Sequence, residues 1–161
     1  MSSGVGSTEP PNSGGAGFAG AGAKRSESDA AATELLHAAM PLARELGIEL
    51  LAAGPDEVES RLAWEERLCT AGGVLHGGVL MALADTTGAY AAFLNLPEGA
   101  GGTATIESKT NFFAPVRSGF VRARSRPLHR GRTTIVVETD LFDDADRHVA
   151  RVTQTQAILG G

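Results

Sequence analysis

The chain has a single cysteine, Cys69, so it can form no intrachain disulfide and offers no cysteine cluster for a metal ion. It also lacks the basic start and apolar core of a secretory signal. The only apolar run near the length of a membrane span, residues 79–96, is interrupted by Asp85, two threonines and a glycine. These absences predict a cytoplasmic protein that does not engage a membrane.

An excess of positive charge is missing too, because the formal net charge is −5 at pH 7. Nucleic-acid binding normally needs a basic surface, so we expect no nucleic-acid partner. The basic residues are concentrated between Glu107 and Glu138, where seven occur without an acidic residue among them. They are Lys109, Arg117, Arg122, Arg124, Arg126, Arg130 and Arg132.

The length of 161 residues, with 42% hydrophobic content, suits one globular domain and hardly two. Residues 1–27 consist mainly of Gly, Ser, Ala and Pro and have little to bury. We therefore predict a disordered tail over residues 1–27 and one domain over residues 28–161. Ser28 or Asp29 can cap a first helix, and a second short helix is expected at residues 41–46.

The order of the remaining elements predicts an α+β fold. Two strands, at residues 48–51 and 58–64, precede a Gly-rich turn and one long apolar helix that ends near Leu94. Four β-like runs follow, at residues 103–113, 120–128, 133–142 and 148–157. Short turns favour an antiparallel sheet, and a single apolar helix requires that sheet to curl around it. That is the outline of a hotdog fold.

Asp85 is the most unusual residue of the long helix. Between Val79 and Leu96 the only other ionisable side chain is Tyr90, so the helix should be apolar on nearly every face and buried, and Asp85 with it. Removing water from a carboxylate is costly, and a chain that tolerates this usually has a use for the group. The alternative is a structural carboxylate held by threonine or backbone groups.

Two segments beside Asp85 carry a family resemblance. The string LCTAGGVLHGG at residues 68–78 and the string TNFFAPV at residues 110–116 resemble the PaaI-like branch of the hotdog thioesterases. The resemblance covers roughly residues 41–159. It implies a sheet wrapped around one helix, a dimer or dimer of dimers, and hydrolysis of acyl-coenzyme A thioesters. It implies no metal or redox cofactor, since coenzyme A is part of the substrate.

The resemblance also assigns catalytic roles. Asp85 stands where the family carries its catalytic Asp or Glu, and would act as general base on water or as a nucleophile. The backbone N–H of Gly77 would stabilise the oxyanion, which suits an N–H at the start of a helix. His76 belongs to the same motif, where we expect it to brace the turn by hydrogen bonding rather than to shuttle a proton.

Substrate-binding positions follow from the same motifs. Thr70 stands where the family often has Asn or Gln, and Thr105 where some relatives have a hydroxyl that holds the attacking water. The arginines have a candidate purpose, because coenzyme A carries phosphates that arginine recognises. Arg122, Arg124 and Arg126 share one strand face, which could equally be a solvated surface. The remaining candidates are Gly78, Asn111, Phe112, Pro115, and the turn Arg130, Gly131 and Arg132. Phe112, Phe113 and Trp64 are expected in the core.

Spacing along the helix points to a dimer. Gly77 and Asp85 are eight residues apart, which is about 12 Å along a helix and too far to act on one carbonyl. The two groups should therefore come from different chains, with two such helices packed antiparallel. Two other functions stay open, a hotdog dehydratase and a non-catalytic acyl-coenzyme A binding or sensing module. A dehydratase needs a His that acts on a hydroxyacyl chain, and the surroundings of His76 do not resemble that arrangement.

Overall fold

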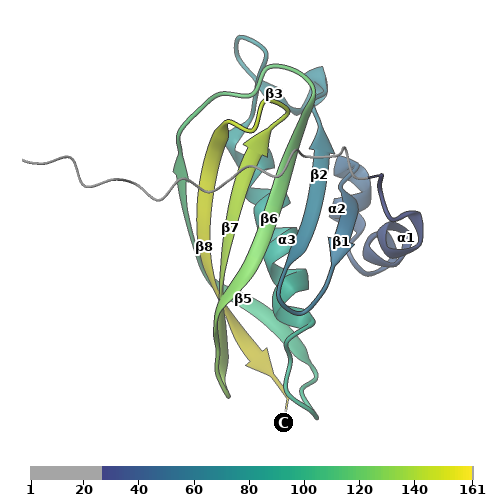
Figure 1. Cartoon of the computed structure of the whole chain (residues 1–161), viewed down its shortest axis with the longest axis vertical. Helices are drawn as coiled ribbons and strands as arrows, with labels where there is room; N and C mark the ends of the chain where they lie inside the picture. The colour runs from purple at the N-terminus through teal and green to yellow at the C-terminus, as the bar shows by residue number, and fades with distance from the viewer. Residues whose placement is uncertain (1–26, 161) are drawn as a thin grey trace, which may run out of the picture.

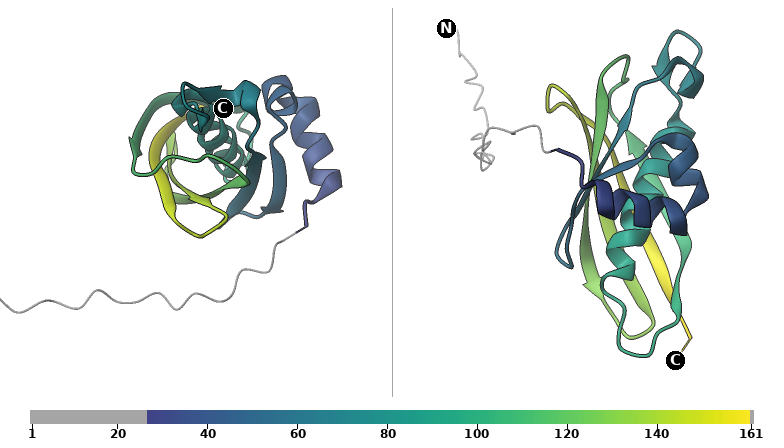
Figure 2. Two further views of the ribbon diagram at one scale, coloured as in Figure 1. Left: turned by 90° about the horizontal axis from the view of Figure 1, so that it is seen from above. Right: turned by 90° about the vertical axis from the view of Figure 1, so that its right-hand side faces the viewer.

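Six antiparallel strands form one sheet in the order β1-β2-β6-β7-β8-β5, and a long helix, α3, packs against it (Figure 1). The structure is a computed structural model that describes residues 27–160. Seen from above, the sheet curls around α3, so the predicted hotdog fold is confirmed (Figure 2). The strands are β1 (Glu49–Ala53), β2 (Val58–Ala63), β5 (Gly102–Phe112), β6 (Phe120–Arg130), β7 (Thr134–Asp143) and β8 (His148–Leu159), and α3 is Gly77–Phe93.

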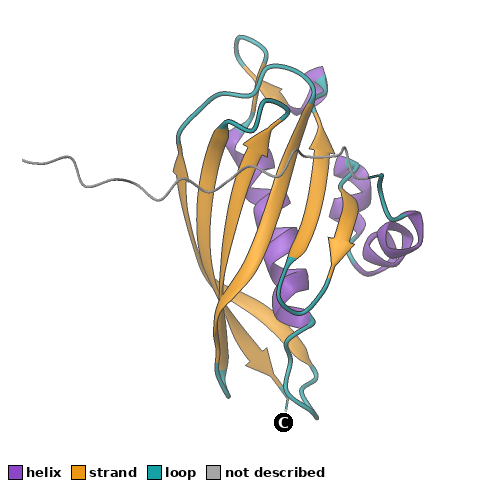
Figure 3. Ribbon diagram, in the orientation of Figure 1, coloured by secondary structure: helices purple, strands orange, loops and turns teal. Residues whose placement is uncertain are grey.

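The predicted division into a tail and a domain is only partly within the described residues. Residues 1–26, nearly the whole of the predicted tail, lie outside them. From Ala30 onward the predicted elements all occur, with boundaries shifted by a few residues (Figure 3). Buried and half-buried residues alternate along β2, the first half of β6 and most of β7, so every second side chain there faces α3. The sequence periodicity is therefore the periodicity of the core.

Two short helices cover the β1 edge of the sheet. Helix α1 (Ala30–Ala39) begins at Asp29, whose carboxylate accepts the N–H of Ala32, and α2 (Pro41–Leu46) follows directly. The backbone of the edge strand is paired with this segment, because the Leu50 N–H donates to Thr33 Oγ1 at 3.0 Å. The Leu50 carbonyl accepts the N–H of Asp29 at 2.8 Å. The β1 edge is thus closed by the chain itself.

The opposite edge is formed by β5, which pairs only with β8. Along its eleven residues most side chains are exposed, including Ile106 and Phe112. Phe112 and Phe113 were predicted in the core, but 51% and 55% of their surfaces are accessible. That prediction is wrong because β5 has no further layer of this chain over it. Trp64, also predicted in the core, is half-buried and donates its indole N–H to the Gly73 carbonyl.

The segment between β2 and α3 contains short regular elements that were not predicted from the sequence. A 3-10 turn (Glu66–Leu68) leads into β3 (Cys69–Thr70), which pairs with β4 (Val74–Leu75). The turn between them contains Gly72 and Gly73, both with positive φ (76° and 68°), a conformation that glycine adopts without strain. This small hairpin places Thr70 and Leu75 next to the start of α3.

Helix α3 buries one side against the sheet and leaves the other uncovered. Leu83, Ala84 and Ala91 are fully buried, whereas 40% of Met81 and 55% of Phe93 are accessible. Exposed and half-buried positions on this side recur every one to four residues and will be called the α3 stripe: Gly78, Met81, Ala82, Asp85, Ala89 and Phe93. The prediction of a helix buried on nearly every face is therefore wrong for the single chain. None of the described helices is long and apolar enough to cross a membrane.

Candidate active site

The first turn of α3 presents a backbone donor without an acceptor. His76 caps the helix, and its Nδ1 accepts the N–H of Gly78 at 2.9 Å, which is the kind of bond that the predicted bracing role requires. The His76 carbonyl accepts the N–H of Val79 at 2.9 Å. Between these groups the Gly77 N–H has no acceptor among residues 27–160. A free N–H at the positive end of a helix dipole is suited to bind an oxyanion.

A largely apolar cavity of about 390 Å³ lies beside Gly77. The ring of Phe112 covers Gly77 so closely that a Cβ at position 77 would lie 3.2 Å from Phe112 Cζ. Three of the predicted substrate-binding residues, Thr70, Phe112 and Pro115, line this cavity. Its other walls are Val74, Leu75, Leu80, Phe113, Ala114 and Val116.

Asp85 lies two turns further along α3, on the α3 stripe, and is half-buried rather than buried as predicted. One carboxylate oxygen, Oδ1, accepts the Thr105 hydroxyl at 2.9 Å and the Gln154 side-chain N–H at 3.3 Å. The structure therefore brings the predicted Thr105 to Asp85. The carboxylate keeps solvent access because the strand that contacts it, β5, is the open edge of the sheet.

Two glutamines lie close to Asp85 and were not among the site residues predicted from the sequence. Gln154 and Gln156 of β8 are both fully buried, and Gln156 donates to the Thr105 hydroxyl at 2.6 Å. In the sequence these residues stand in a run of alternating Thr and Gln, which is typical of a solvated strand. The available signal was the shared face, since Ala150 and Val152 precede them at spacing two and are apolar.

The two groups predicted to be catalytic, the Gly77 N–H and the Asp85 carboxylate, do not meet within one chain. The Gly77 cavity is not lined by Asp85, and eight helical residues separate the two positions, about 12 Å along the axis. Gly78 lies between them on the α3 stripe. It is exposed, and its N–H donates to His76 Nδ1. Asn111 directly precedes Phe112 on β5 and pairs in register with the exposed Arg151. Its side chain therefore projects from the opposite face of the sheet to that of Phe112. The structure does not bring Asn111 to either group.

The turn predicted to bind coenzyme A is partly occupied by contacts within the chain. Arg130 donates to Asn95 Oδ1 at 2.6 Å and to Asp56 Oδ1 at 2.7 Å, which ties β6 to the β1–β2 turn. Gly131 fits a position where a Cβ would lie 2.8 Å from the Thr134 carbonyl. Arg132 is exposed, and none of the described residues forms a hydrogen bond or ion pair with it.

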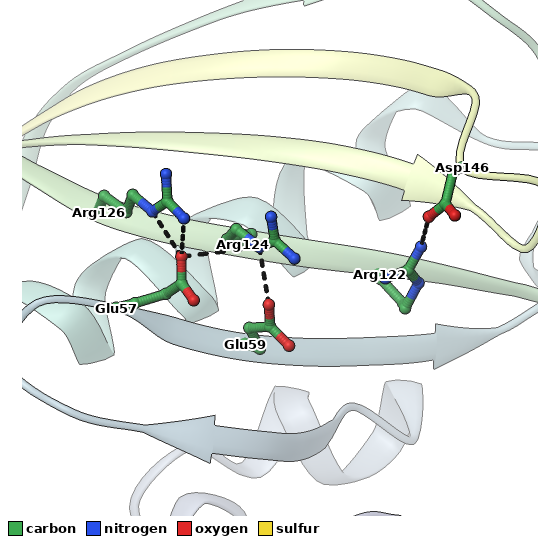
Figure 4. A network of polar contacts seen from close by, with 6 residues as sticks. All are labelled: Glu57, Glu59, Arg122, Arg124, Arg126 and Asp146. Carbon is green, nitrogen blue, oxygen red and sulfur yellow. Dashed lines mark hydrogen bonds and ion pairs between the residues drawn. The ribbon is translucent and has the colours of Figure 1, made fainter. Parts of the chain in front are cut away.

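The three alternating arginines of β6 form ion pairs on the outer face of the sheet (Figure 4). Arg124 contacts Glu59 at 2.7 Å and Glu57 at 3.6 Å, Arg126 also pairs with Glu57, and Arg122 pairs with Asp146. Burial acts to lower the pKa of Arg124, but the hydrogen bond to Glu59 and the nearby carboxylates raise it overall. These arginines share one face as predicted, but their positive charge is already balanced.

The same arrangement continues on β7 and β8. Asp140 contacts Arg151 at 2.7 Å and His148 at 2.7 Å. Burial acts to raise the pKa of Asp140, yet the hydrogen bond and charge of Arg151, aided by His148, lower it overall. Within residues 27–160 no group of three or more His, Cys, Asp or Glu residues could hold a metal ion.

Comparisons with known proteins agree with this architecture. A family model described as the thioesterase superfamily matches residues 72–150. The proofreading thioesterase EntH of Cronobacter turicensis is 33% identical over 119 residues, which are 74% of this chain and 86% of that protein. A thioesterase from Haemophilus influenzae has a crystal structure that matches with a TM-score of 0.70 and 34% identity, covering 74% of this chain and 82% of that one. The E. coli PaaI protein, from the phenylacetic acid degradation operon, matches in fold with a TM-score of 0.72 at 22% identity, covering 80% and 91%.

Proposed function

Because this chain belongs to the thioesterase superfamily and has its hotdog fold, we propose that it hydrolyses acyl-coenzyme A thioesters at a site shared between two subunits. Asp85 of one subunit would act with the Gly77 N–H of the partner subunit. The observation that carries this proposal is the Gly77 N–H, which has no acceptor among residues 27–160 and belongs to the lining of an apolar cavity, on the same helix as a solvent-accessible carboxylate.

The uncovered side of the molecule supports a second copy of this chain as the partner. The midpoint between Gly77 and Asp85 is Met81, which is exposed on the α3 stripe. Two α3 helices packed antiparallel about a two-fold axis near Met81 bring Asp85 of one subunit beside Gly77 of the partner subunit, and the reverse. The open β5 edge lies next to the α3 stripe, so the same partner covers its exposed apolar side chains. A dimer and a dimer of dimers both satisfy this requirement.

The chemistry assigned to each group follows from charge. As the acyl carbon is attacked, negative charge develops on the carbonyl oxygen, and the Gly77 N–H stabilises it. In the base route Asp85 takes a proton from water, the water oxygen bonds to the acyl carbon, the C–S bond breaks, and the thiolate takes the proton. In the nucleophile route an Asp85 oxygen bonds to the acyl carbon and expels the thiolate, and water then cleaves the mixed anhydride. Both routes release the free acid and coenzyme A.

The substrate contacts are proposed in the same frame. The cavity lined by Thr70, Phe112 and Pro115 would take the apolar part of the substrate next to the carbonyl. Arg132, exposed at the β6–β7 turn, is the member of the Arg130–Arg132 turn that is left for a phosphate of coenzyme A. Arg130 would hold the turn in place rather than bind the phosphate, because its guanidinium is already bonded to Asn95 and Asp56.

Replacement of Asp85 by Asn tests the proposed activity. We expect wild-type protein to release thiol from at least one member of an acyl-coenzyme A panel of aliphatic and aromatic acyl groups. The Asp85→Asn variant should lose turnover by about three orders of magnitude and keep ligand affinity in calorimetry. The Glu98→Gln variant, which neutralises an exposed carboxylate beyond α3, is the matched control and should retain turnover.

Two results would contradict the proposal. Binding of acyl-coenzyme A without hydrolysis by the wild type would indicate a binding or sensing module instead. Equal turnover of acyl-N-acetylcysteamine and acyl-coenzyme A thioesters would remove coenzyme A as the recognised carrier while leaving thioester hydrolysis in place.

The subunit arrangement has its own test. Met81→Glu puts a charge at the proposed two-fold axis, and we expect light scattering to show a monomer that has lost most turnover. Leu128→Glu puts the same charge on an exposed apolar residue of β6 and should leave the oligomer and its turnover unchanged. An active monomer of either protein would contradict the shared site.

A further inference from the structure

A directed chain of hydrogen bonds ends at Asp85. The Thr103 hydroxyl donates to Gln156 Oε1 at 2.6 Å, and Gln156 Nε2 donates to the Thr105 hydroxyl at 2.6 Å. The Thr105 hydroxyl in turn donates to Asp85 Oδ1 at 2.9 Å. Because the Gln156 amide donates to Thr105, the Thr105 proton is directed at the carboxylate, and each bond polarises the next.

A second donor reaches the same oxygen by a separate route. Gln154 Nε2 lies 3.3 Å from Asp85 Oδ1 and 3.5 Å from the Asp85 carbonyl oxygen. The Gln154 side chain lies across α3 at Gly88, where a Cβ would be 2.6 Å from Gln154 Oε1 and 2.7 Å from its Cδ. Glycine at position 88 thus gives this glutamine the space to reach Asp85.

The cost of these glutamines argues against a purely structural role. Both are fully buried on the strand face that also carries Ala150, Val152 and Ile158, and Gln154 Oε1 is buried with no hydrogen-bond partner in the described part of the chain. A buried polar atom without a partner is destabilising, and an apolar side chain would pack at this position without that penalty. The group that both glutamines reach, directly or through Thr105, is the Asp85 carboxylate.

We propose that Gln154 and Gln156 are positioning residues that hold Asp85 by Oδ1, so that Oδ2 is the oxygen that reacts with water or with the acyl carbon. Within residues 27–160 Oδ2 accepts no hydrogen bond, and Asp85 is open on the α3 stripe. This inference rests on the proposed thioesterase function and adds to it the residues that fix the geometry of the reacting group. Gln156 acts through Thr105, whereas Gln154 acts directly.

A double-mutant cycle in the full-length protein separates these two routes. We expect Gln156→Leu and Thr105→Val each to lower kcat about 10- to 100-fold with KM changed by less than about 3-fold, since substrate contacts remain. The double variant Thr105→Val/Gln156→Leu should be no worse than Thr105→Val alone. Gln154→Leu combined with Thr105→Val should be worse than either single variant, because it removes both donors from Oδ1.

Two further variants serve as controls for this test. Thr105→Ser retains the hydroxyl and should recover most of the kcat that Thr105→Val loses. Ser125→Ala removes a buried hydroxyl of the Ser125–Thr139 pair on the same sheet, away from Asp85, and should leave kcat and KM unchanged. If a glutamine variant fails to fold, Thr105→Val and Thr105→Ser give the outcome for the Thr105 route on their own.

The failures are distinguishable. Wild-type kcat in Gln156→Leu and Thr105→Val, with Asp85→Asn inactive, would overturn the positioning role and leave the proposed function standing. Losses that multiply in Thr105→Val/Gln156→Leu would overturn the route through Thr105. A wild-type protein without thioesterase activity would overturn the proposed function and this inference together.

Discussion

Polar groups on the outer face of the sheet have partners within the chain, whereas several of those on the side formed by the α3 stripe and β5 do not. On the outer face, Arg122, Arg124 and Arg126 each have an acidic partner within the chain. On the other side, the Gly77 N–H has no acceptor in the described residues, and Asp85 has hydrogen bonds to only one of its oxygens. Under the proposed function, the side with unpaired polar groups is the one that receives the substrate and a partner subunit.

This contrast also changes the meaning of the cationic segment. The seven basic residues between Glu107 and Glu138 suggested a phosphate-binding surface, because the sequence shows no acidic residue among them. In the fold, β2 lies beside β6, and Glu59 of β2 and Glu57, which directly precedes this strand, reach these arginines from more than sixty residues earlier in the chain. The charge of four of the seven basic residues, Arg122, Arg124, Arg126 and Arg130, is therefore paired with acidic side chains that are distant in sequence.

The largest effect should come from removing the unpaired donor on the open side. Gly77→Pro deletes the N–H at the first helical position, where proline is tolerated, and His76 already has the extended backbone that precedes proline (φ −64°, ψ 135°). We expect kcat to fall about 100- to 1000-fold without loss of the fold, measured by thiol release and circular dichroism. Gly77→Ala keeps the N–H and places the same Cβ against Phe112, so it should retain most of the activity. Equal loss in both variants would show that the steric contact, not the donor, matters.

A smaller effect is expected from crowding Gln154. Gly88→Ala places a Cβ 2.6 Å from Gln154 Oε1, so the side chain must retreat from Asp85. We expect kcat to fall about 10-fold and the free energy of unfolding to fall by about 1–3 kcal/mol. In Gly88→Ala/Gln154→Ala the clash is relieved, so the double variant should lose less free energy of unfolding than the two single variants lose together. Its kcat should stay low. Recovery of kcat in the double variant would contradict a role for Gln154.

On the outer face the same kind of change should do little. Arg124→Ala removes the partly exposed ion pairs with Glu59 and Glu57, and we expect denaturant unfolding to show a loss of about 0.2–1 kcal/mol. Because the guanidinium is committed to Glu59, the KM for an acyl-coenzyme A substrate should not change. If the KM instead rose by an order of magnitude, coenzyme A would bind on this face and the contrast between the two sides would disappear.

The smallest effect concerns acid. The pKa of Asp140 is lowered in the folded protein, so its ionised form contributes stability that is present above the ordinary Asp pKa of about 3.9 and is lost as pH falls through the lowered value. Asp140→Asn should therefore be less stable than wild type by under about 1 kcal/mol at pH 6, with a smaller difference near pH 3. Urea unfolding at both pH values measures this, and a difference that grows toward pH 3 would reverse the assigned sign.

Much of the fold could be predicted from the sequence because its periodicities are local and strong. Residues 120–128 and 133–142 alternate apolar and polar side chains, and both became strands that continue to Arg130 and Asp143. The family motif drew attention to Gly77 and Asp85 because a helix start and a lone acid are visible along the chain, and their catalytic roles stay predictions. The eight-residue spacing placed them apart, and the structure keeps them apart.

The surroundings of Asp85 could not be predicted in the same way. Its exposure depends on how far the sheet reaches around α3, and the open β5 edge is a property of strand order rather than of any local pattern. Gln154 and Gln156 reach Asp85 because β8 lies beside β5, a contact between segments far apart in the sequence. The ion pairs of Arg124 and Arg130 likewise depend on strands and turns that meet only in the fold.

The most direct test of a shared site is a mixed dimer. Asp85→Asn and Gly77→Pro chains, coexpressed with different tags and purified for both, form dimers in which one site combines the two defects and the other has neither. We expect each parent protein to be inactive and the mixed dimer to show about half of the wild-type activity per dimer. A mixed dimer as inactive as its parents would contradict the account, because it would show that Asp85 and Gly77 do not act across the interface.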